Sequence, residues 1–342
     1  MRVGIISEQS LTAEALSRTI LLRSAHEIHW VANSATTAVD LCAAKTPDVV
    51  LMAPPFVAMD GVDVTRRIMS GSPCPILIVT EHLGINTTFV LDALGVGALG
   101  AVDLLGFDGT DPSAGTTTLL AKMDTISRLM GEKVNGGNGK VPSVTAPRDA
   151  CLVAIGASAG GPAAIATILR ALPSDFPGSI VIVQHVGAEF VPGMASWLGD
   201  QSGRRVDVAV EGDRPTRTRT LVAGATGHLT FKGSTRLGYT AEPLDSAYCP
   251  SVDVFFRSVA RCWRGQAIGV VLTGMGRDGA AGLKALRDKG HHTIAQDEAT
   301  SVVYGMPKAA AALDAAIDVL PLDRIAERLL ELADSLVVRQ EK

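Results

Sequence analysis

A serine in a glycine-rich turn is the residue of this chain best suited to do chemistry. The segment Gly156-Ala-Ser158-Ala-Gly160 follows an apolar run that begins at Cys151, and Pro162 suits the first turn of a helix directly after it. A Gly-x-Ser-x-Gly turn between a strand and a helix projects the hydroxyl outward, where backbone N–H groups can stabilise an oxyanion. The glycines allow backbone angles that a Cβ would forbid. The pattern predicts a serine nucleophile.

Three other interpretations of the turn compete with this one. A dinucleotide site has Gly-x-Gly-x-x-Gly and an acidic residue after the next strand. Here Ser158 replaces the second glycine, and the next strand, Ser179–Gln184, is followed by His185. A phosphate-binding loop would end in Gly-Lys-Ser or Gly-Lys-Thr, which this stretch lacks. The turn alone therefore leaves a nucleophile and a purely structural glycine turn both open.

A serine nucleophile needs a base, and the base needs an acid that orients it. His185 follows the apolar strand Ile180–Gln184, and Asp278 lies in a second glycine-rich turn after the strand Ile268–Thr273. Taken singly, the histidine is a packing residue and the aspartate a helix cap. Because functional groups gather at the carboxyl ends of parallel strands, the three together favour a Ser158–His185–Asp278 triad.

Other histidines and another triad order are alternatives to this set. His228 and the adjacent His291 and His292 are weaker candidate bases. The order Ser…His…Asp also differs from the Ser…Asp/Glu…His order of the α/β-hydrolases, so membership of that group is disfavoured.

Two series of alternating strands and amphipathic helices can position these residues. In residues 1–130 five apolar segments, separated by helical patterns, predict a small doubly wound parallel sheet: Val3–Ile6, Ile28–Val31, Val49–Met52, Ile76–Val79 and Ala98–Val102. Residues 131–149 are rich in Gly and Asn and predict a flexible linker.

A second series, residues 150–338, predicts another mainly parallel α/β sheet. Its long strands carry the candidate triad at their ends. Four shorter segments, separated by Gly and Pro, predict antiparallel ribbons attached to that sheet: Val206–Val210, Leu221–Ala223, His228–Phe231 and Leu237–Thr240. A helix that starts at Pro321 or Leu322 and runs to Leu336 is expected to close the series.

Composition excludes several classes of function. The 342 residues are 47% hydrophobic but only 4% aromatic, which suits aliphatic cores of parallel strands covered by helices. A net charge of −4 gives no reason to expect nucleic acid or an anionic membrane as partner. The five scattered cysteines predict reduced thiols rather than disulfides or a zinc site, and no apolar run approaches the roughly 18 residues of a membrane span. We expect a cytoplasmic protein without membrane insertion.

Five motifs occur in order along the second series: Gly156-Ala-Ser-Ala-Gly-Gly161, Val183-Gln-His185, Pro250-Ser-Val-Asp-Val254, Leu272-Thr-Gly-Met-Gly-Arg-Asp-Gly279, and Ala295-Gln-Asp-Glu-Ala299 followed by Tyr304-Gly-Met-Pro307. Together they are specific to one family. Over about residues 150–335 the chain closely resembles the catalytic domain of the bacterial chemotaxis protein-glutamate methylesterases, the CheB family. The resemblance implies hydrolysis of glutamyl methyl esters on the cytoplasmic helices of methylated chemoreceptors, with release of methanol. It also implies deamidation of receptor glutamines, and makes other chemosensory proteins further candidate partners.

Carried over by position, the resemblance gives each residue a role. Ser158 is the nucleophile, His185 the general base and acid, and Asp278 its orienting carboxylate. The backbone N–H of Met275 is an oxyanion donor, and no metal or organic cofactor is implied. Two positions depart from the family pattern, because Ala159 replaces a common Thr and Cys249 replaces the usual Arg. These departures bear on rate and substrate detail rather than on the class of reaction.

The first series resembles a response-regulator receiver, a flavodoxin-like fold, but lacks most of its phosphorylation residues. Receivers hold a metal ion and accept a phosphoryl group through an acidic pair, an Asp, a Ser or Thr, and a Lys at successive strand ends. The matching positions here are Ser7 beside Glu8, Ala53, Thr80, and Leu104 or Leu105. Since Ala53 has no carboxylate to phosphorylate, we expect a degenerate receiver without aspartyl phosphorylation. Asp48 and Asp60 are weak substitute acceptors.

Two alternatives to a receptor methylesterase stay open. One is a non-enzymatic chemosensory adaptor or scaffold, against which the complete Ser158, His185 and Asp278 set argues. The other is a carboxylesterase or amidase that acts on a different substrate, which surface contacts rather than motifs would decide.

Overall fold

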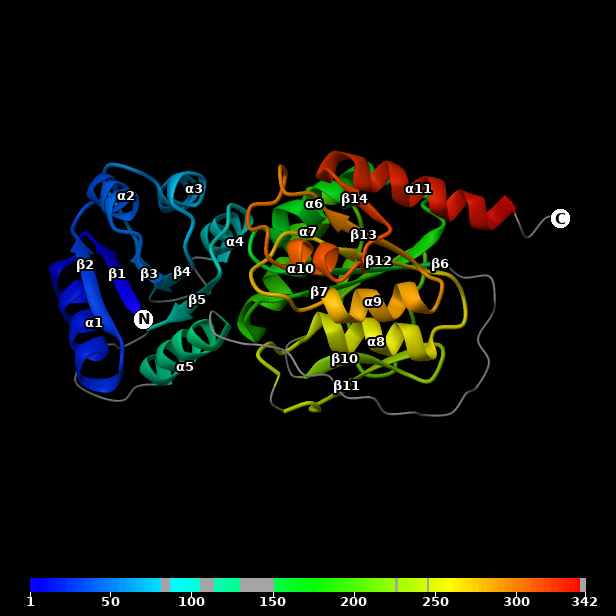
Figure 1. Cartoon of the computed structure of the whole chain (residues 1–342), viewed down its shortest axis with the longest axis horizontal. Coiled ribbons are helices and arrows are strands. Elements are labelled where there is room, and N and C mark those ends of the chain that lie inside the picture. The colour runs from blue at the N-terminus through cyan, green and yellow to red at the C-terminus, as the bar shows by residue number, and fades with distance from the viewer. Residues whose placement is uncertain (81–86, 105–113, 130–150, 225–226, 245, 339–342) are drawn as a thin grey trace. The chain divides into compact units, whose positions relative to one another are not determined.

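The computed structural model describes residues 1–80, 87–104, 114–129, 151–224, 227–244 and 246–338. The chain divides into two compact units, Met1–Lys133 and Val134–Lys342, each with its own sheet (Figure 1). The predicted linker, residues 131–149, lies outside the described residues.

The first unit is a five-stranded parallel sheet in the order β2-β1-β3-β4-β5. This order is that of the flavodoxin-like doubly wound folds, as the sequence predicted. Helices α2, α3 and α4 cover one face of the sheet, and α1 and α5 cover the other (Figure 1). The elements are β1 (Arg2–Ser7), α1 (Ser10–Arg23), β2 (Glu27–Ala32), α2 (Ala35–Ala44), β3 (Val49–Ala53), α3 (Gly61–Gly71), β4 (Ile76–Thr80), α4 (Thr87–Gly95), β5 (Gly100–Asp103) and α5 (Ala114–Leu129).

The second unit contains a seven-stranded, wholly parallel sheet in the order β14-β13-β12-β6-β7-β9-β8. Its elements begin with β6 (Cys151–Ala157), α6 (Gly161–Ala171), β7 (Gly178–Gln184), a 3-10 turn (Ala188–Phe190), α7 (Val191–Ser202), β8 (Val206–Val208) and β9 (Thr220–Val222). They continue with β10 (His228–Lys232), β11 (Arg236–Thr240), α8 (Val252–Cys262), β12 (Ala267–Val271), α9 (Ala280–Asp288), β13 (His292–Gln296), α10 (Met306–Ala312), β14 (Asp318–Leu320) and α11 (Leu322–Val338).

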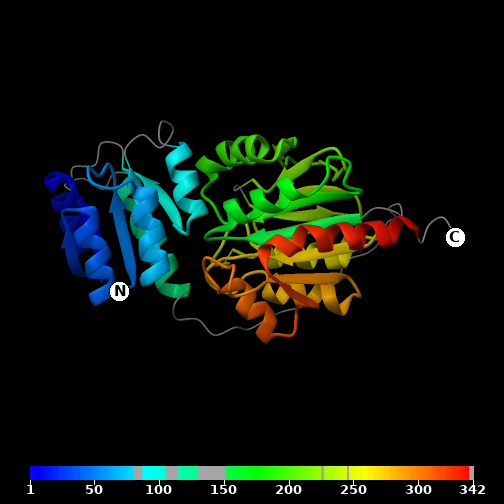
Figure 2. The same cartoon turned by 90° about the horizontal axis from the view of Figure 1, so that it is seen from above.

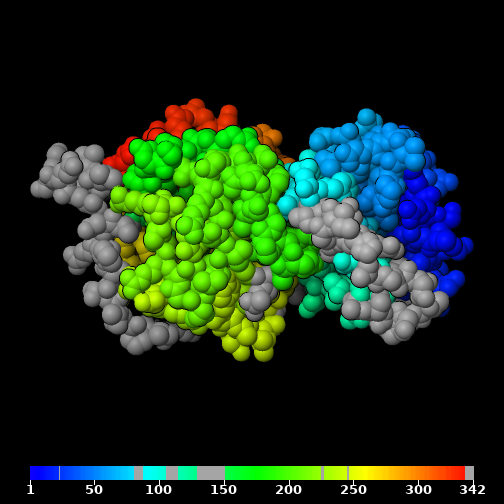
Figure 3. All heavy atoms as spheres, turned by 180° about the vertical axis from the view of Figure 1, so that it is seen from behind, coloured from blue at the N-terminus to red at the C-terminus, as the bar shows by residue number. Residues whose placement is uncertain are grey.

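Helices cover both faces of this second sheet. Helices α6, α7 and α11 pack together on one face, and α8, α9 and α10 pack on the other (Figures 1 and 2). The hairpin β10–β11 lies against α8. The ring of Phe231 in the hairpin stacks on that of Phe255 in the helix and is tilted against that of Trp263, the residue that follows the helix. In the space-filling view, green and yellow-green segments that include α7 and β8–β11 cover one side of this unit (Figure 3).

The prediction of antiparallel ribbons is right for one pair of segments and wrong for the other. Strands β10 and β11 do pair antiparallel, His228 opposite Thr240. Strands β8 and β9 instead join the main sheet in parallel, and β9 lies between β7 and β8. The connection of residues 209–219 is long enough to return the chain to the starting edge, which parallel pairing requires.

Candidate active site

Strand register brings Ser158 and His185 together. Strands β6 and β7 are parallel neighbours, and their last residues, Ala157 and Gln184, are register partners. The N–H of His185 donates to the carbonyl of Ala157 at 3.0 Å. Ser158 and His185 are therefore the first residues beyond two adjacent strands, at the edge where the chain leaves both.

The sheet reverses its winding at the same place. From β6 the chain moves outward through β7 to β8, and it later returns to place β12 on the other side of β6. Ligands of doubly wound sheets bind where the strand order reverses in this way. The N–H of Ser158 donates to the carbonyl of Thr273, just past β12, at 3.1 Å. Ser158 thus lies between the histidine turn and the turn that carries Asp278.

A buried amide fixes the backbone of the nucleophile and of the base. The side-chain nitrogen of Gln184 donates to the carbonyl of Ser158 at 2.8 Å and to that of His185 at 3.2 Å. Gly160 has a φ of +77°, which an L side chain rarely adopts, so the turn before α6 favours glycine there. At Gly161 any Cβ would collide with the amide oxygen of Gln184.

Asp278 accepts hydrogen bonds from the start of helix α8. Its side chain is 9% exposed, and the backbone N–H groups at this helix end carry partial positive charge that attracts a carboxylate. The donors are Ser251 Oγ (2.9 Å), Val252 N (2.7 Å), Asp253 N (2.9 Å) and Gly279 N (3.1 Å), besides His185 Nε2 (2.8 Å).

These bonds keep Asp278 ionised. Burial opposes ionisation, but the hydrogen bonds from His185 and from the N–H groups of Asp253 and Val252 outweigh burial and hold the pKa of this carboxyl below its usual range. An ionised carboxylate only accepts hydrogen bonds, so the proton in the 2.8 Å contact belongs to Nε2 of His185. In the neutral imidazole, Nδ1 is then the nitrogen with a free lone pair.

The hydroxyl and the lone pair are both buried and unpaired. Neither Ser158 Oγ nor His185 Nδ1 has a hydrogen-bond partner among the described residues, and Ser158 is 1% exposed. The hydrogen bond between His185 and Asp278 is formed in this structure, whereas one between Ser158 and His185 is not. Catalytic hydrogen bonds are often long before substrate binds, so the arrangement remains compatible with proton transfer from Oγ to Nδ1.

The turn after β12 brings Gly274, the residue before Met275, against Ser158. A Cβ added to Gly274 would lie 2.7 Å from Ser158 Cβ and would also collide with Met306 Sδ, so only glycine allows this approach. The carbonyl of Gly274 accepts from the N–H of Met306 at 2.8 Å, whereas the N–H of Met275 has no acceptor among the described residues. Because Met275 follows Gly274 in the chain, its unpaired N–H is a candidate donor to an oxyanion formed at Ser158.

Three parts of the site were missed by sequence reasoning. Gln184 and Ser251 stand in the motifs without a predicted role, and Tyr248 lies outside the motifs. The rings of Tyr248 and His185 are stacked, with centroids 3.8 Å apart and planes 6° from parallel. Ser251 caps α8, and a signal was available, since Ser-Val-Asp before an apolar periodic run marks a helix start.

The other histidines are engaged elsewhere. Nδ1 of His228 accepts from the N–H of Ser251 and its Nε2 lies 3.1 Å from the carbonyl of Pro243, so this side chain supports the loop before α8. His291 accepts from the N–H of Ala267 at 3.3 Å, and His292 pairs with Asp318 on the neighbouring strand at 2.7 Å. None of the three lies at the turn of Ser158.

In the first unit, Ala53 stands at the end of β3, the position at which a receiver carries its acceptor aspartate. Ser7 and Ala53 are register partners at the ends of β1 and β3, and Ala53 is buried. Thr80 ends β4, and the buried Leu104 follows β5. Leu105 lies outside the described residues. Glu8 accepts from the N–H of Val57, a residue of the loop after β3, at 2.7 Å.

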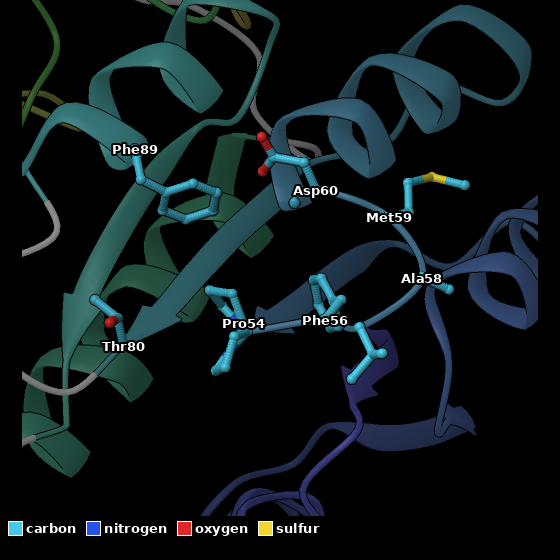
Figure 4. A pocket seen from close by; sticks show the side chains of 10 residues that line it. Pro54, Phe56, Ala58, Met59, Asp60, Thr80 and Phe89 are labelled. Carbon is cyan, nitrogen blue, oxygen red and sulfur yellow. The ribbon is translucent and has the colours of Figure 1, made fainter.

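A pocket of about 620 Å³ lies beyond the ends of β3 and β4. Figure 4 shows Phe89 and Asp60 on one side of it and Pro54 and Phe56 on the other. Among its described lining residues Asp60 is the one carboxylate, and it caps α3 by accepting from the N–H of Val62 at 3.1 Å. The carboxylate of Asp60 is thereby engaged as a helix cap.

Asp48, the second weak substitute for an acceptor aspartate, lies at the opposite edge of the first sheet. Asp48 precedes β3, and its carboxylate accepts from the backbone N–H and the guanidinium of Arg2 at 2.6 and 3.0 Å. Because Arg2 begins β1, this pair belongs to the amino-terminal edge of the sheet. Neither substitute stands where a receiver carries its acceptor.

The described ranges also bear on metal binding and on membrane insertion. No group of three or more His, Cys, Asp or Glu side chains there could hold a metal ion. Over the same ranges no helix has both the length and the apolar character needed to cross a membrane. All five cysteines are free thiols, and Cys249 is the exposed one.

Comparison with known proteins matches both the site and the whole chain. Residues 153–329 match the family model for the CheB methylesterase. The chain is 52% identical to the protein-glutamate methylesterase/protein-glutamine glutaminase 1 of Cupriavidus pinatubonensis over 98% of each chain, and 47% identical to the corresponding protein of Mesorhizobium japonicum over 98% of this chain and 99% of that one. The crystal structure of the Thermotoga maritima CheB methylesterase catalytic domain is 34% identical, with a TM-score of 0.51, and covers 53% of this chain and 97% of that one. The chain belongs to the CheB methylesterase family.

Proposed function

We propose that this protein is a serine hydrolase that removes methyl esters from glutamate residues of chemoreceptors and deamidates receptor glutamines. The observation that supports the proposal is that the turns of Ser158, His185 and Asp278 meet at one reversal of the sheet. Ser158 and His185 follow register-paired strand ends, and His185 Nε2 lies 2.8 Å from the ionised carboxylate of Asp278.

In the first half of the reaction, Ser158 Oγ attacks the ester carbonyl of the glutamyl side chain while Nδ1 of His185 takes the hydroxyl proton. The N–H of Met275 stabilises the oxyanion of the tetrahedral intermediate. Loss of one such donor typically lowers kcat by about 10²- to 10³-fold. The imidazolium then gives its proton to the departing methoxide, which leaves as methanol.

In the second half, water attacks the glutamyl ester on Ser158 and His185 again accepts the proton. Collapse of this intermediate returns the proton to Ser158 Oγ and releases the glutamic acid side chain, which loses its remaining proton to solvent. Deamidation of glutamine follows the same path, with ammonia as the first leaving group. Asp278 keeps Nε2 protonated throughout, so that Nδ1 performs both transfers.

The substrate that we propose is the methylated cytoplasmic helix of a chemoreceptor, with other chemosensory proteins as further partners. A cytoplasmic location follows from that substrate and suits free thiols. Regulation is proposed to be independent of aspartyl phosphorylation, because Ala53 occupies the acceptor position at the end of β3.

Methanol release from membranes that contain methylated chemoreceptor tests the proposal. The wild type should release methanol and Ser158→Ala should not. Ser202→Ala serves as the matched control, since that hydroxyl only bonds the carbonyl of Leu198 within α7. Release by neither wild type nor variant would favour an adaptor, and release by both would remove Ser158 from the mechanism. Cleavage of a simple ester but not of receptor, still dependent on Ser158, would indicate a different substrate.

A further inference from the structure

Tyr248 contacts two parts of the proposed machinery at once. Its ring stacks on that of His185 with centroids 3.8 Å apart and planes 6° from parallel. Its hydroxyl donates to the carbonyl of Met275 at 3.2 Å. One side chain thereby joins the general base to the turn that presents the oxyanion donor.

The stack with Tyr248 constrains the tilt of the His185 ring plane, which the hydrogen bond to Asp278 leaves free. A single hydrogen bond at Nε2 fixes one point of the His185 ring but allows the ring plane to tilt about that point. A flat partner parallel to the ring removes this freedom, so the direction of the Nδ1 lone pair is fixed as well. When His185 takes the serine proton it becomes a cation on the face of an aromatic ring, an arrangement that favours the charged form.

The hydroxyl of Tyr248 constrains the turn that carries the Met275 N–H. Gly276, the next residue after Met275, has a φ of +84°, and a Cβ there would lie 3.0 Å from the Tyr248 oxygen. The turn therefore passes directly over this side chain. Burial, together with the charge of Asp278, raises the pKa of Tyr248, so the hydroxyl remains a donor at neutral pH.

We propose that Tyr248 is a positioning residue of this hydrolase. Its ring holds the imidazole of His185 with Nδ1 available to Ser158, and its hydroxyl fixes the turn that carries the Met275 N–H. The inference rests on the proposed function, because it assigns Tyr248 a part in that same reaction. Tyr248 acts through its neighbours and takes no proton itself.

The test compares Tyr248→Leu, which removes both contacts, with Tyr248→Phe, which keeps the ring. For Tyr248→Leu we expect kcat for methanol release to fall about 10- to 100-fold, with KM within about twofold of wild type. Tyr248→Phe should recover most of the loss and stay within about fivefold of wild type.

Tyr239→Phe is the matched control. Its hydroxyl accepts from Gly224 N and donates to Ala209 O, each at 2.7 Å, in the β11 region of the same unit. This variant also loses tyrosine hydrogen bonds and should lower the unfolding temperature, but it should leave kcat unchanged. If kcat fell as much in this control as in Tyr248→Leu, the loss in Tyr248→Leu would be explained by lower stability alone, and the proposal would be overturned.

A spectroscopic measurement separates positioning from folding. Because the His185 ring lies on an aromatic face, its C–H protons should resonate upfield of those of the other histidines in wild type and Tyr248→Phe, and lose that shift in Tyr248→Leu. Full activity of Tyr248→Leu, or no rescue by Phe, would overturn the inference while the proposed function stands. A wild type that releases no methanol would instead refute the proposed function.

Discussion

Replacement of Asp278 by Asn gives the sharpest test of how the base is oriented. One oxygen, Oδ2, accepts from His185 Nε2 and from the N–H of Val252. The other, Oδ1, accepts from the Ser251 hydroxyl and from the N–H groups of Asp253 and Gly279. An asparagine must place an NH₂ group, which cannot accept, at one of these two positions.

The two orientations of the amide differ in what they leave unpaired. An NH₂ at the Oδ1 position leaves two backbone N–H groups without an acceptor, whereas an NH₂ at the Oδ2 position leaves one. A buried unpaired donor costs about 1–3 kcal/mol, so the second orientation is favoured. That orientation obliges His185 Nε2 to accept, which moves the ring proton to Nδ1 and removes the base that Ser158 needs.

We therefore expect kcat for methanol release to fall about 10³- to 10⁴-fold in Asp278→Asn, as the equivalent change does in the serine-protease triad. The free energy of unfolding should fall by about 2–4 kcal/mol, from the unpaired donor and the lost charge. Nitrogen NMR of ¹⁵N-labelled histidine should show His185 protonated at Nε2 in the wild type and at Nδ1 in the variant.

Asp318→Asn is the matched control, because Asp318 forms a similar pair with His292 at 2.7 Å and also accepts from Arg328 at 2.8 Å, away from the site. It should lose stability while it keeps kcat. The reasoning would be refuted by an Asp278→Asn protein that retains more than about a tenth of the wild-type kcat. It would also be refuted by a folded, inactive variant whose His185 is still protonated at Nε2.

Three further predictions concern other parts of the chain. Burial and the charge of Asp278 raise the pKa of Asp253 from 3.8 to about 6, so the unfolded chain loses this proton first as pH rises and stability falls across that interval. In urea unfolding, Asp253→Asn should therefore gain about 1–3 kcal/mol relative to wild type between about pH 4 and pH 6.5, and a flat difference would contradict this. Gly274→Ala should lower kcat at least about 100-fold, since its Cβ would displace the Met275 turn from Ser158; near-normal kcat would exclude an oxyanion role for that turn. A small phosphodonor with Mg²⁺ should leave no aspartyl phosphate on residues 1–133 and no change in methanol release, and mass spectrometry of that segment would detect either result.

Much of the fold could be predicted because it follows from local patterns. Apolar runs separated by helical periodicity placed the strands of the first sheet, which has the expected flavodoxin-like order, and strands β6, β7, β12 and β13 of the second. Strand β14 was not predicted. The parallel pairing of β8 and β9 could not be predicted, since strands of three residues carry no signal that separates parallel from antiparallel partners.

The residues of the candidate site also differ in whether a local sequence pattern could predict them. Residue type and place in a turn singled out Ser158, His185 and Asp278, because glycine-rich strand ends have a local signature. The contacts of Tyr248 and Gln184 have no local sequence signature, because the type of an aromatic or amide side chain near a strand end or in a loop does not predict its tertiary contacts. The strand ends and the helix start around these two side chains come together only in the tertiary structure.

The sequence by itself determined which side chains are capable of chemistry and that the first unit lacks a carboxylate at Ala53, because composition and turn motifs are local properties. Tertiary structure alone decided which nitrogen of His185 is free. The start of α8, 26 residues before Asp278 in the chain, holds that carboxylate against Nε2, and only the packing of the sheet brings the two together.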